Sequence, residues 1–133
     1  MTTKFVIPGN PQAWERARYD GRSKRFFTAS KSFSYKTLIA HCAKESGIRL
    51  LSGPVRVSIN LYLKRPLKMP KASGLGVLRC WKRPDVDNFS KNYLDALNGI
   101  AWVDDGQVHS LEVVKWYHEK DGEPRAVVQI EEI

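Results

Sequence analysis

The chain has little cysteine, and its apolar residues never run together for long. Its two cysteines, Cys42 and Cys80, lie far apart and not at the short Cys/His spacing of zinc ligands. We therefore expect reduced structural thiols rather than a disulfide framework or a structural zinc site. No apolar run approaches the roughly 20 residues of a membrane span, and residues 1–9 lack the apolar core of a signal peptide. The expectation is a cytoplasmic protein with no membrane partner.

Several catalytic signatures are also missing. The sequence contains no Walker loop, no GxGxxG motif and no Ser/His/Asp arrangement, so we expect no small-molecule cofactor. The three histidines, His41, His109 and His118, are not paired at metal-ligand spacing, and none is assigned a catalytic role. The remaining candidates for catalytic groups are therefore carboxylates and lysines.

Acidic residues are scarce in the first two thirds of the chain. Residues 1–84 contain 18 Lys/Arg against 3 Asp/Glu, whereas residues 85–133 contain 4 against 11, which together give the net charge of +8. A basic surface beside a concentrated acidic cluster is typical of a protein that holds a polyanion next to a divalent metal. The alternative is a solvated basic face that only keeps the protein soluble. Because aromatic residues alternate with the cations, we favour nucleic acid.

The length of 133 residues indicates one domain spanning residues 1–133. Periodicity predicts an α/β (α+β) fold, with a small mixed sheet of about four strands and two main helices. The predicted strands cover residues 4–7, 55–63, 107–118 and 125–132, the last two as a hairpin pair, and the helices cover 30–46 and about 88–98. Between them, residues 65–84 form a basic, flexible loop that we expect to act as an arm over the substrate.

Arginine and lysine gather in two segments that are predicted to contact DNA. Guanidinium groups bind phosphate in a bidentate manner, and nearby aromatic rings can stack on unpaired bases. An alternative for the first segment is a hairpin around Asp20 and Gly21 whose aromatics cover the core while its arginines face solvent. The candidate DNA-binding residues are Arg16, Arg18, Arg22, Lys24, Arg25, Lys82 and Arg83.

The segment of residues 82–108 carries the candidate chemistry. Asp85 and Asp87 precede a short amphipathic helix, and Asp104 and Asp105 follow it in a turn. Magnesium prefers hard oxygen ligands, and folding could bring Asp85, Asp87 and one of the two later aspartates together around one ion. Lys91, one helical turn beyond Asp87, is placed to offset charge on a phosphate or to orient the attacking water.

Plainer interpretations exist for each of these acids. An aspartate at a helix start is often a cap, and Asp-Gly is ordinary turn chemistry. Asp95 and Lys91 could form a surface ion pair worth less than about 1 kcal/mol. The combination of two acidic clusters, one lysine and a basic surface nevertheless favours metal-dependent phosphodiester hydrolysis.

Three blocks of this segment resemble one family. Arg-Pro-Asp-Val-Asp-Asn-Phe-Ser-Lys at 83–91, Leu-Asp-Ala-Leu-Asn-Gly-Ile at 94–100 and Asp-Asp-Gly-Gln-Val at 104–108 are similar to the RusA family of Holliday-junction resolvases, prophage type. The resemblance implies a homodimeric endodeoxyribonuclease of DNA recombination and repair, dependent on Mg²⁺ or Mn²⁺, which makes paired symmetric nicks in four-way junctions. It implies Asp85, Asp87 and Asp105 as metal ligands, Lys91 as the catalytic lysine, and Asp104 and Asp95 as candidates for supporting roles. It also implies a phage-encoded or nucleoid-associated protein of a bacterial host.

Two other functions remain open at this point. The chain could be a non-catalytic module that binds branched nucleic acid, or a nuclease of broader taste that acts on flaps or forks. The dimer surface is not evident either. The strands at 107–118 and 125–132 hold more apolar residues than one core face needs, so we nominate Val113, Val114, Trp116, Val127, Val128 and Ile130.

Overall fold

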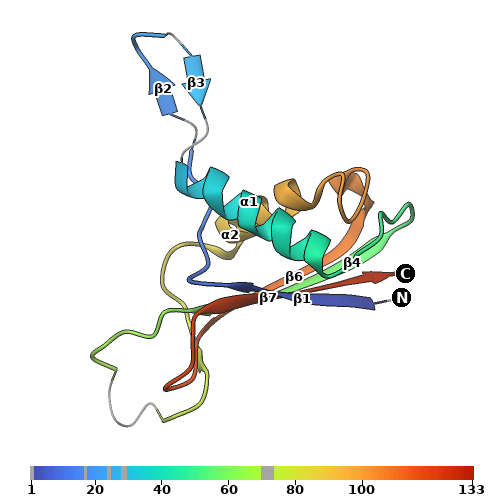
Figure 1. The fold of residues 1–133 in the computed structure, drawn as a ribbon. Helices are drawn as coiled ribbons and strands as arrows, with labels where there is room; N and C mark the ends of the chain where they lie inside the picture. Colours follow the sequence, from blue (N-terminus) through green and yellow to red (C-terminus); the bar gives the residue numbers. More distant parts are fainter. Residues whose placement is uncertain (1, 17, 24, 28–29, 70–73) are drawn as a thin grey trace.

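The computed structural model describes residues 2–16, 18–23, 25–27, 30–69 and 74–133, with the backbone alone at 18–20 and 25–27. Figure 1 shows two helices lying on one face of a sheet, with a short hairpin projecting beyond them. The strands are β1 (Thr2–Pro8), β2 (Arg18–Asp20), β3 (Arg25–Phe27), β4 (Val55–Leu63), β5 (Leu78–Arg79), β6 (Val108–Tyr117) and β7 (Arg125–Glu132). The helices are α1 (Ser30–Glu45), α2 (Val86–Leu97) and the 3-10 turn η2 (Asp105–Gln107).

The main sheet is mixed and has the order β1-β7-β4-β6-β5. This confirms the predicted α+β class, with β5 as a two-residue addition to the four strands expected from periodicity. Strand β4 lies parallel to β6 and antiparallel to β7. The predicted pairing of β6 with β7 is therefore wrong, because β4 lies between them. The connection at 118–124 is long enough to cross one strand, since neighbouring strands are about 4.8 Å apart.

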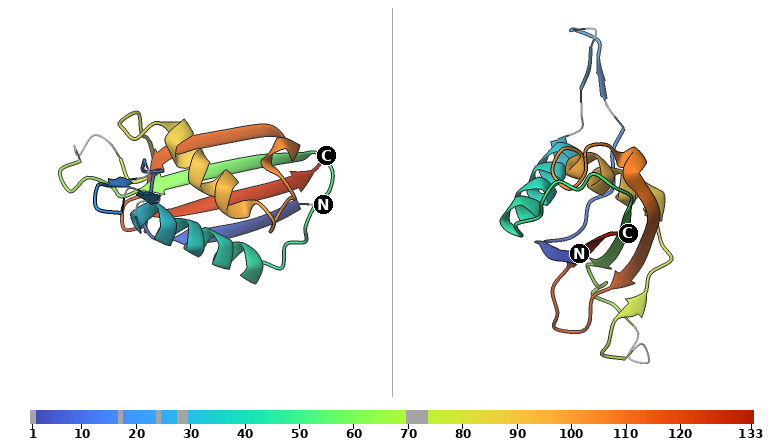
Figure 2. Two further views of the ribbon diagram at one scale, coloured as in Figure 1. Left: turned by 90° about the horizontal axis from the view of Figure 1, so that it is seen from above. Right: turned by 90° about the vertical axis from the view of Figure 1, so that its right-hand side faces the viewer.

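Alternation along β4 explains its central place. Its inward side chains, Val55, Val57, Ile59, Leu61 and Leu63, are all buried, and Arg56, Ser58, Asn60 and Tyr62 face the opposite side. Both helices cover the inward face, as the two views in Figure 2 show. The second face of the sheet carries no helix among the described residues, and we refer to it as the open face.

Helix α2 buries the apolar stripe that its spacing predicts. Phe89, Tyr93 and Leu97 are buried against the sheet, and Ile100 lies beyond the helix end. The helix begins at Val86 with Asp85 as its N-cap residue, two residues before the start near residue 88 that the sequence predicts. Among the described helices, none is long and apolar enough to cross a membrane.

A buried tyrosine pair joins the two helices. The hydroxyls of Tyr35 on α1 and Tyr93 on α2 share a hydrogen bond, and the rings meet edge to face at 5.7 Å. Desolvation raises the pKa of both hydroxyls well above the ordinary value of 10.0. Each hydroxyl thus depends on the other for its hydrogen bond in a dry environment.

We expect Tyr93→Phe to destabilise the fold by about 1–3 kcal/mol, because it leaves the Tyr35 hydroxyl buried without a partner. The double variant Y35F/Y93F should recover most of this loss. Above about pH 10 the unfolded chain releases tyrosine protons that the folded chain retains, so wild-type stability should fall with rising pH, and less so in the double variant. Urea unfolding at pH 7 and pH 10.5 measures both effects; equal stability of the two variants at pH 7 would contradict the pairing.

The N-terminal basic segment forms a separate two-stranded sheet, β2 with β3. Figure 1 shows it projecting from the layer of helices rather than lying along the edge of the main sheet. Arg16 and Arg22 are exposed. The predicted DNA contacts of Lys24, and of the Arg18 and Arg25 side chains, fall outside what the structure describes. The same holds for the alternative in which Tyr19, Phe26 and Phe27 cover the core.

The predicted dimer surface is partly used by the core. Val128 and Ile130 face inward and are buried beneath the helices, and Val113 packs against the same cluster. They are therefore unavailable for a partner. Val114, Trp116 and Val127 lie on the open face, because their register partners on β4 are its outward residues.

Candidate active site

The start of α2 presents two carboxylates that capping does not use. The Asp85 carbonyl accepts hydrogen bonds from the backbone N–H groups of Asn88 and Phe89, but its side chain makes no capping bond. Asp87, in the first turn, is exposed; its backbone carbonyl accepts a hydrogen bond from the Ser90 hydroxyl at 2.8 Å, and its carboxylate has no hydrogen bond or ion pair among the described residues. Both carboxylates lie at the positive end of the helix dipole, which favours negative charge there. The capping interpretation of these acids thus does not account for their side chains.

Lys91 stands on the same side of α2, one turn after Asp87. Its Nζ donates to Asn88 Oδ1 at 3.2 Å and lies 4.6 Å from the centre of the Trp14 ring. An amide oxygen and an aromatic face both stabilise an ammonium ion without neutralising it. The alternative of a surface ion pair between Lys91 and Asp95 is not what the structure shows, because Asp95 instead binds Lys36 of α1 at 2.8 Å. The Lys91 ammonium is therefore not paired with Asp95, and it could interact with a phosphate group.

The segment before the basic hairpin is fastened to α2. The Trp14 backbone N–H donates to the Asn88 carbonyl at 2.8 Å, and Asn92 Nδ2 donates to the Gln12 carbonyl at 2.9 Å. This anchorage places the root of the hairpin beside Lys91. The segment from which the basic hairpin projects and the start of α2 therefore lie next to each other.

Lys115 is a further residue of this region, and it was not predicted from the sequence. It lies on the inward side of β6, and its Nζ donates to the carbonyls of Lys82 and Pro84, the latter at 2.9 Å. These bonds hold the chain that leads into Asp85, and Cys80 N–H adds a bond to the Lys115 carbonyl at 3.2 Å. A charged residue at an inward position of a strand, between Val113 and Tyr117, was the available signal. Lys82 and Arg83, the predicted DNA-binding residues of this segment, are both exposed.

The two aspartates of the Asp-Asp-Gly turn differ in the contacts that their side chains make. Asp104 caps η2: its carboxylate accepts from Gly106 N–H at 3.0 Å, and Gln107 Oε1 accepts from Asp104 N–H. A Cβ atom at residue 106 would lie 2.7 Å from the Asp104 carboxylate, so any larger residue there would require that carboxylate to shift from its capping position. Asp105 is exposed, and within the described chain its carboxylate has no hydrogen bond or ion pair. Only Asp105 of the two is free to take a ligand.

The two acidic clusters lie at opposite ends of α2. Gln107 Nε2 binds the carbonyls of Leu51 and Gly53, which precede β4, whereas Lys115 and the start of α2 lie at the far end of β6. A 12-residue helix is about 18 Å long. Within the described residues no three His, Cys, Asp or Glu side chains gather as a metal site. The structure therefore keeps Asp85, Asp87 and Lys91 together at the start of α2 and separates Asp105 from them within one chain.

Comparison with known proteins identifies the family to which the chain belongs. The family model described as endodeoxyribonuclease RusA matches residues 8–131. An uncharacterized protein of Bacillus subtilis (strain 168), YqaN, is 34% identical over 139 residues, covering 98% of this chain and 96% of its own length. Both matches extend over the basic hairpin, the arm and the two acidic clusters. The chain belongs to the RusA family of endodeoxyribonucleases, a family of Holliday-junction resolvases.

Proposed function

We propose that this chain is a Mg²⁺-dependent endonuclease that nicks four-way DNA junctions as a homodimer. The observation that carries the proposal is the pair of exposed carboxylates, Asp85 and Asp87, beside Lys91 on a basic surface. Neither carboxylate is used for capping, so both are available to a cation. Hard oxygen donors of this kind fit magnesium, which dehydrates reluctantly and is commonly held by one or two carboxylates plus phosphate oxygens.

When bound, a magnesium ion would polarise the phosphate and lower the pKa of the attacking water. Asp85 and Asp87 would hold it at the helix start. The Lys91 ammonium would offset negative charge that develops on the phosphate oxygens. Lys82 and Arg83, immediately before Asp85, would bind the neighbouring phosphates and fix the strand in register.

We propose further that a second copy of the chain supplies Asp105. The Asp105 carboxylate has no partner among the described residues, and it lies about a helix length from Asp85 and Asp87 in its own chain. A two-fold axis perpendicular to α2 would solve this problem, because it reverses the direction of the helix and so can place one end of a chain beside the opposite end of its partner. Each dimer then holds two sites, each built from the α2 start of one copy and the turn of the other. Two identical sites also suit paired nicks on a near-symmetric junction.

The edge of β6 is the surface we propose for this contact. Strand β5 pairs only with Trp116 and Tyr117, so in the described chain residues 108–115 of β6 have no strand on that side. A second β6 added antiparallel would satisfy these backbone groups. It would also bring residue 105 of one copy toward residue 115 of the other, about 23 Å along the strand from its start. The Lys115 end of β6 is where Asp85 begins α2.

The test compares purified protein on a synthetic four-way junction, a fork and a linear duplex of matched sequence. We expect paired nicks in the junction with Mg²⁺, none with EDTA, and at least about tenfold slower cleavage of the fork and duplex. Cleavage of all three substrates at one rate would instead indicate a broader nuclease. Junction binding without cleavage in Mg²⁺ or Mn²⁺ would indicate a non-catalytic module.

A further inference from the structure

A cavity lies beside the chain segment that leads into α2. We call residues 65–84 the arm. Between the arm and the end of β6 is a cavity of about 830 Å³, within the range of small-ligand pockets. Trp116 of β6 and Trp81 of the arm both line it, together with Val77. Because Trp116 belongs to the outward side of β6, the cavity opens on the open face of the sheet.

The walls of the cavity are apolar, and basic side chains lie at its margin. Trp81 is 84% exposed, which is unusual for the largest apolar side chain. The Trp116 indole N–H donates to Asn60 Oδ1 at 3.1 Å, so the orientation of that ring is fixed. Lys68, Arg79 and Lys82 add three cations, and no acid is present among the described lining residues. A flat aromatic ring attached to a phosphate matches this combination of indoles and cations.

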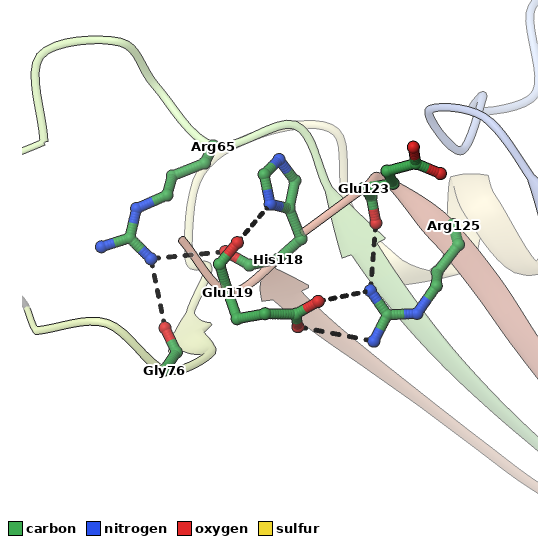
Figure 3. Close-up of polar contacts among 6 residues, drawn as sticks. All are labelled: Arg65, Gly76, His118, Glu119, Glu123 and Arg125. Atoms are coloured by element: carbon green, nitrogen blue, oxygen red, sulfur yellow. Dashed lines mark hydrogen bonds and ion pairs between the residues drawn. The ribbon is translucent and has the colours of Figure 1, made fainter. Parts of the chain in front are cut away.

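Contacts at the base of the arm hold its described parts against the β6–β7 connection, next to the cavity. The Arg65 guanidinium donates to the carbonyls of Gly74 at 2.6 Å, Gly76 at 3.1 Å and His118 at 3.3 Å. Figure 3 shows Arg65 reaching Gly76 and His118, beside the Glu119–Arg125 ion pair of the β6–β7 connection. The backbone N–H of Lys120 adds a bond to the Leu75 carbonyl at 2.9 Å. The described part of the arm is thus tied to the sheet at several points.

The cavity lies close to Asp85 and Asp87, the proposed catalytic carboxylates. Lys82 lines the cavity, and Asp85 follows three residues later, a reach of at most about 10 Å. One DNA strand advances about 3.4 Å per stacked nucleotide, so this reach corresponds to about three nucleotides. We propose that the cavity takes one unpaired base of the branched DNA, stacked on Trp81, within about three nucleotides of the phosphate that is cut. This inference rests on the proposed function, because it requires the strand to lie at Asp85 and Asp87.

The test removes the stacking ring and follows the base directly. We expect Trp81→Ala to weaken binding of a four-way junction in EDTA by about 5- to 150-fold, and to leave linear-duplex binding unchanged. Trp81→Phe should retain most of the affinity. Leu67→Ala is the matched control, since Leu67 is 97% exposed on the same arm but does not line this cavity. Fluorescence anisotropy with labelled DNA measures all four proteins.

The same junction carrying 2-aminopurine at successive positions near the branch locates the captured base. At one position, the emission should change on binding wild type and Trp81→Phe but not on binding Trp81→Ala. Unchanged affinity and emission in Trp81→Ala, from protein that cuts junctions at the wild-type rate, would overturn the inference and leave the proposed function intact. A Trp81-dependent emission change in wild-type protein that never cuts would support base capture and overturn the nuclease proposal.

Discussion

Asp87→Asn is expected to lower magnesium-dependent cleavage of a four-way junction by about 10²- to 10³-fold or more, while junction binding is kept or becomes tighter. Asparagine retains the size of the side chain but removes the charge that would hold the cation. Removing that charge also removes repulsion between the carboxylate and the DNA phosphates, which accounts for the gain in affinity. Because Asp87 is exposed and its side chain makes no hydrogen bond in the described chain, the substitution should not disturb the fold.

Single-turnover cleavage with Mg²⁺ and anisotropy binding in EDTA separate the two effects. Asp121→Asn is the matched control: it is the same chemical change in an exposed residue of the β6–β7 connection. Residue 121 has a φ of 64°, which asparagine tolerates as well as aspartate does. Its cleavage rate should equal that of wild type. Cleavage by Asp87→Asn at the wild-type rate would exclude this residue from the site.

Local pattern was sufficient for most of the fold. The alternation of Val, Ile and Leu along β4 and the four- and three-residue spacing of Phe89, Tyr93 and Leu97 in α2 each report which side of an element faces the core. Such periodicity depends on neighbours within one element, so it can be read from the chain alone. The two-residue strand β5 is too short to show any period, and the sequence gives no sign of it.

The order of the strands in the sheet, by contrast, could not be predicted from local periodicity. The segments that form β6 and β7 are consecutive and joined by a short connection, which usually indicates a hairpin. In the structure β4, from much earlier in the chain, inserts between them and pairs with both. Its five inward side chains form the longest buried row of the sheet, and a central position lets two neighbours shield them. This outcome depends on a contact between segments more than 40 residues apart, and no local pattern encodes it.

The candidate site shows the same division. The sequence singled out each acid and Lys91 as candidates, since these residues lie in short motifs with a clear chemical meaning. It did not show that two clusters flanking a helix are kept apart by that helix, which is about 18 Å long here. Nor did it distinguish Asp104 from Asp105, because the cap that uses Asp104 depends on the position of Gly106 N–H in the folded turn. The structure thereby leads to a sharper question, which is whether a site is built within one chain or between two.

Mixing two inactive variants answers that question. Asp87→Asn and Asp105→Asn should each be inactive alone, yet together they should regain nicking activity when subunits can exchange. If each site combines Asp85 and Asp87 of one copy with Asp105 of the other, a mixed dimer has one site with both changes and one with none. Random exchange then leaves about a quarter of all sites intact, so single nicks should return at about a quarter of the wild-type rate, and paired nicks much less.

The control is a mixture of Asp85→Asn with Asp87→Asn, which damages the same half of the site in both copies and should stay inactive. Co-expression with two different affinity tags, followed by sequential purification, provides the mixed dimer and proves that it formed. If the purified Asp87→Asn/Asp105→Asn dimer does not nick a junction, the two copies do not share their sites. Asp105 would then have no route to the α2 start, since its own chain holds it at the other end of the helix, and the metal ligands would have to be sought among Asp85, Asp87 and groups from the DNA itself.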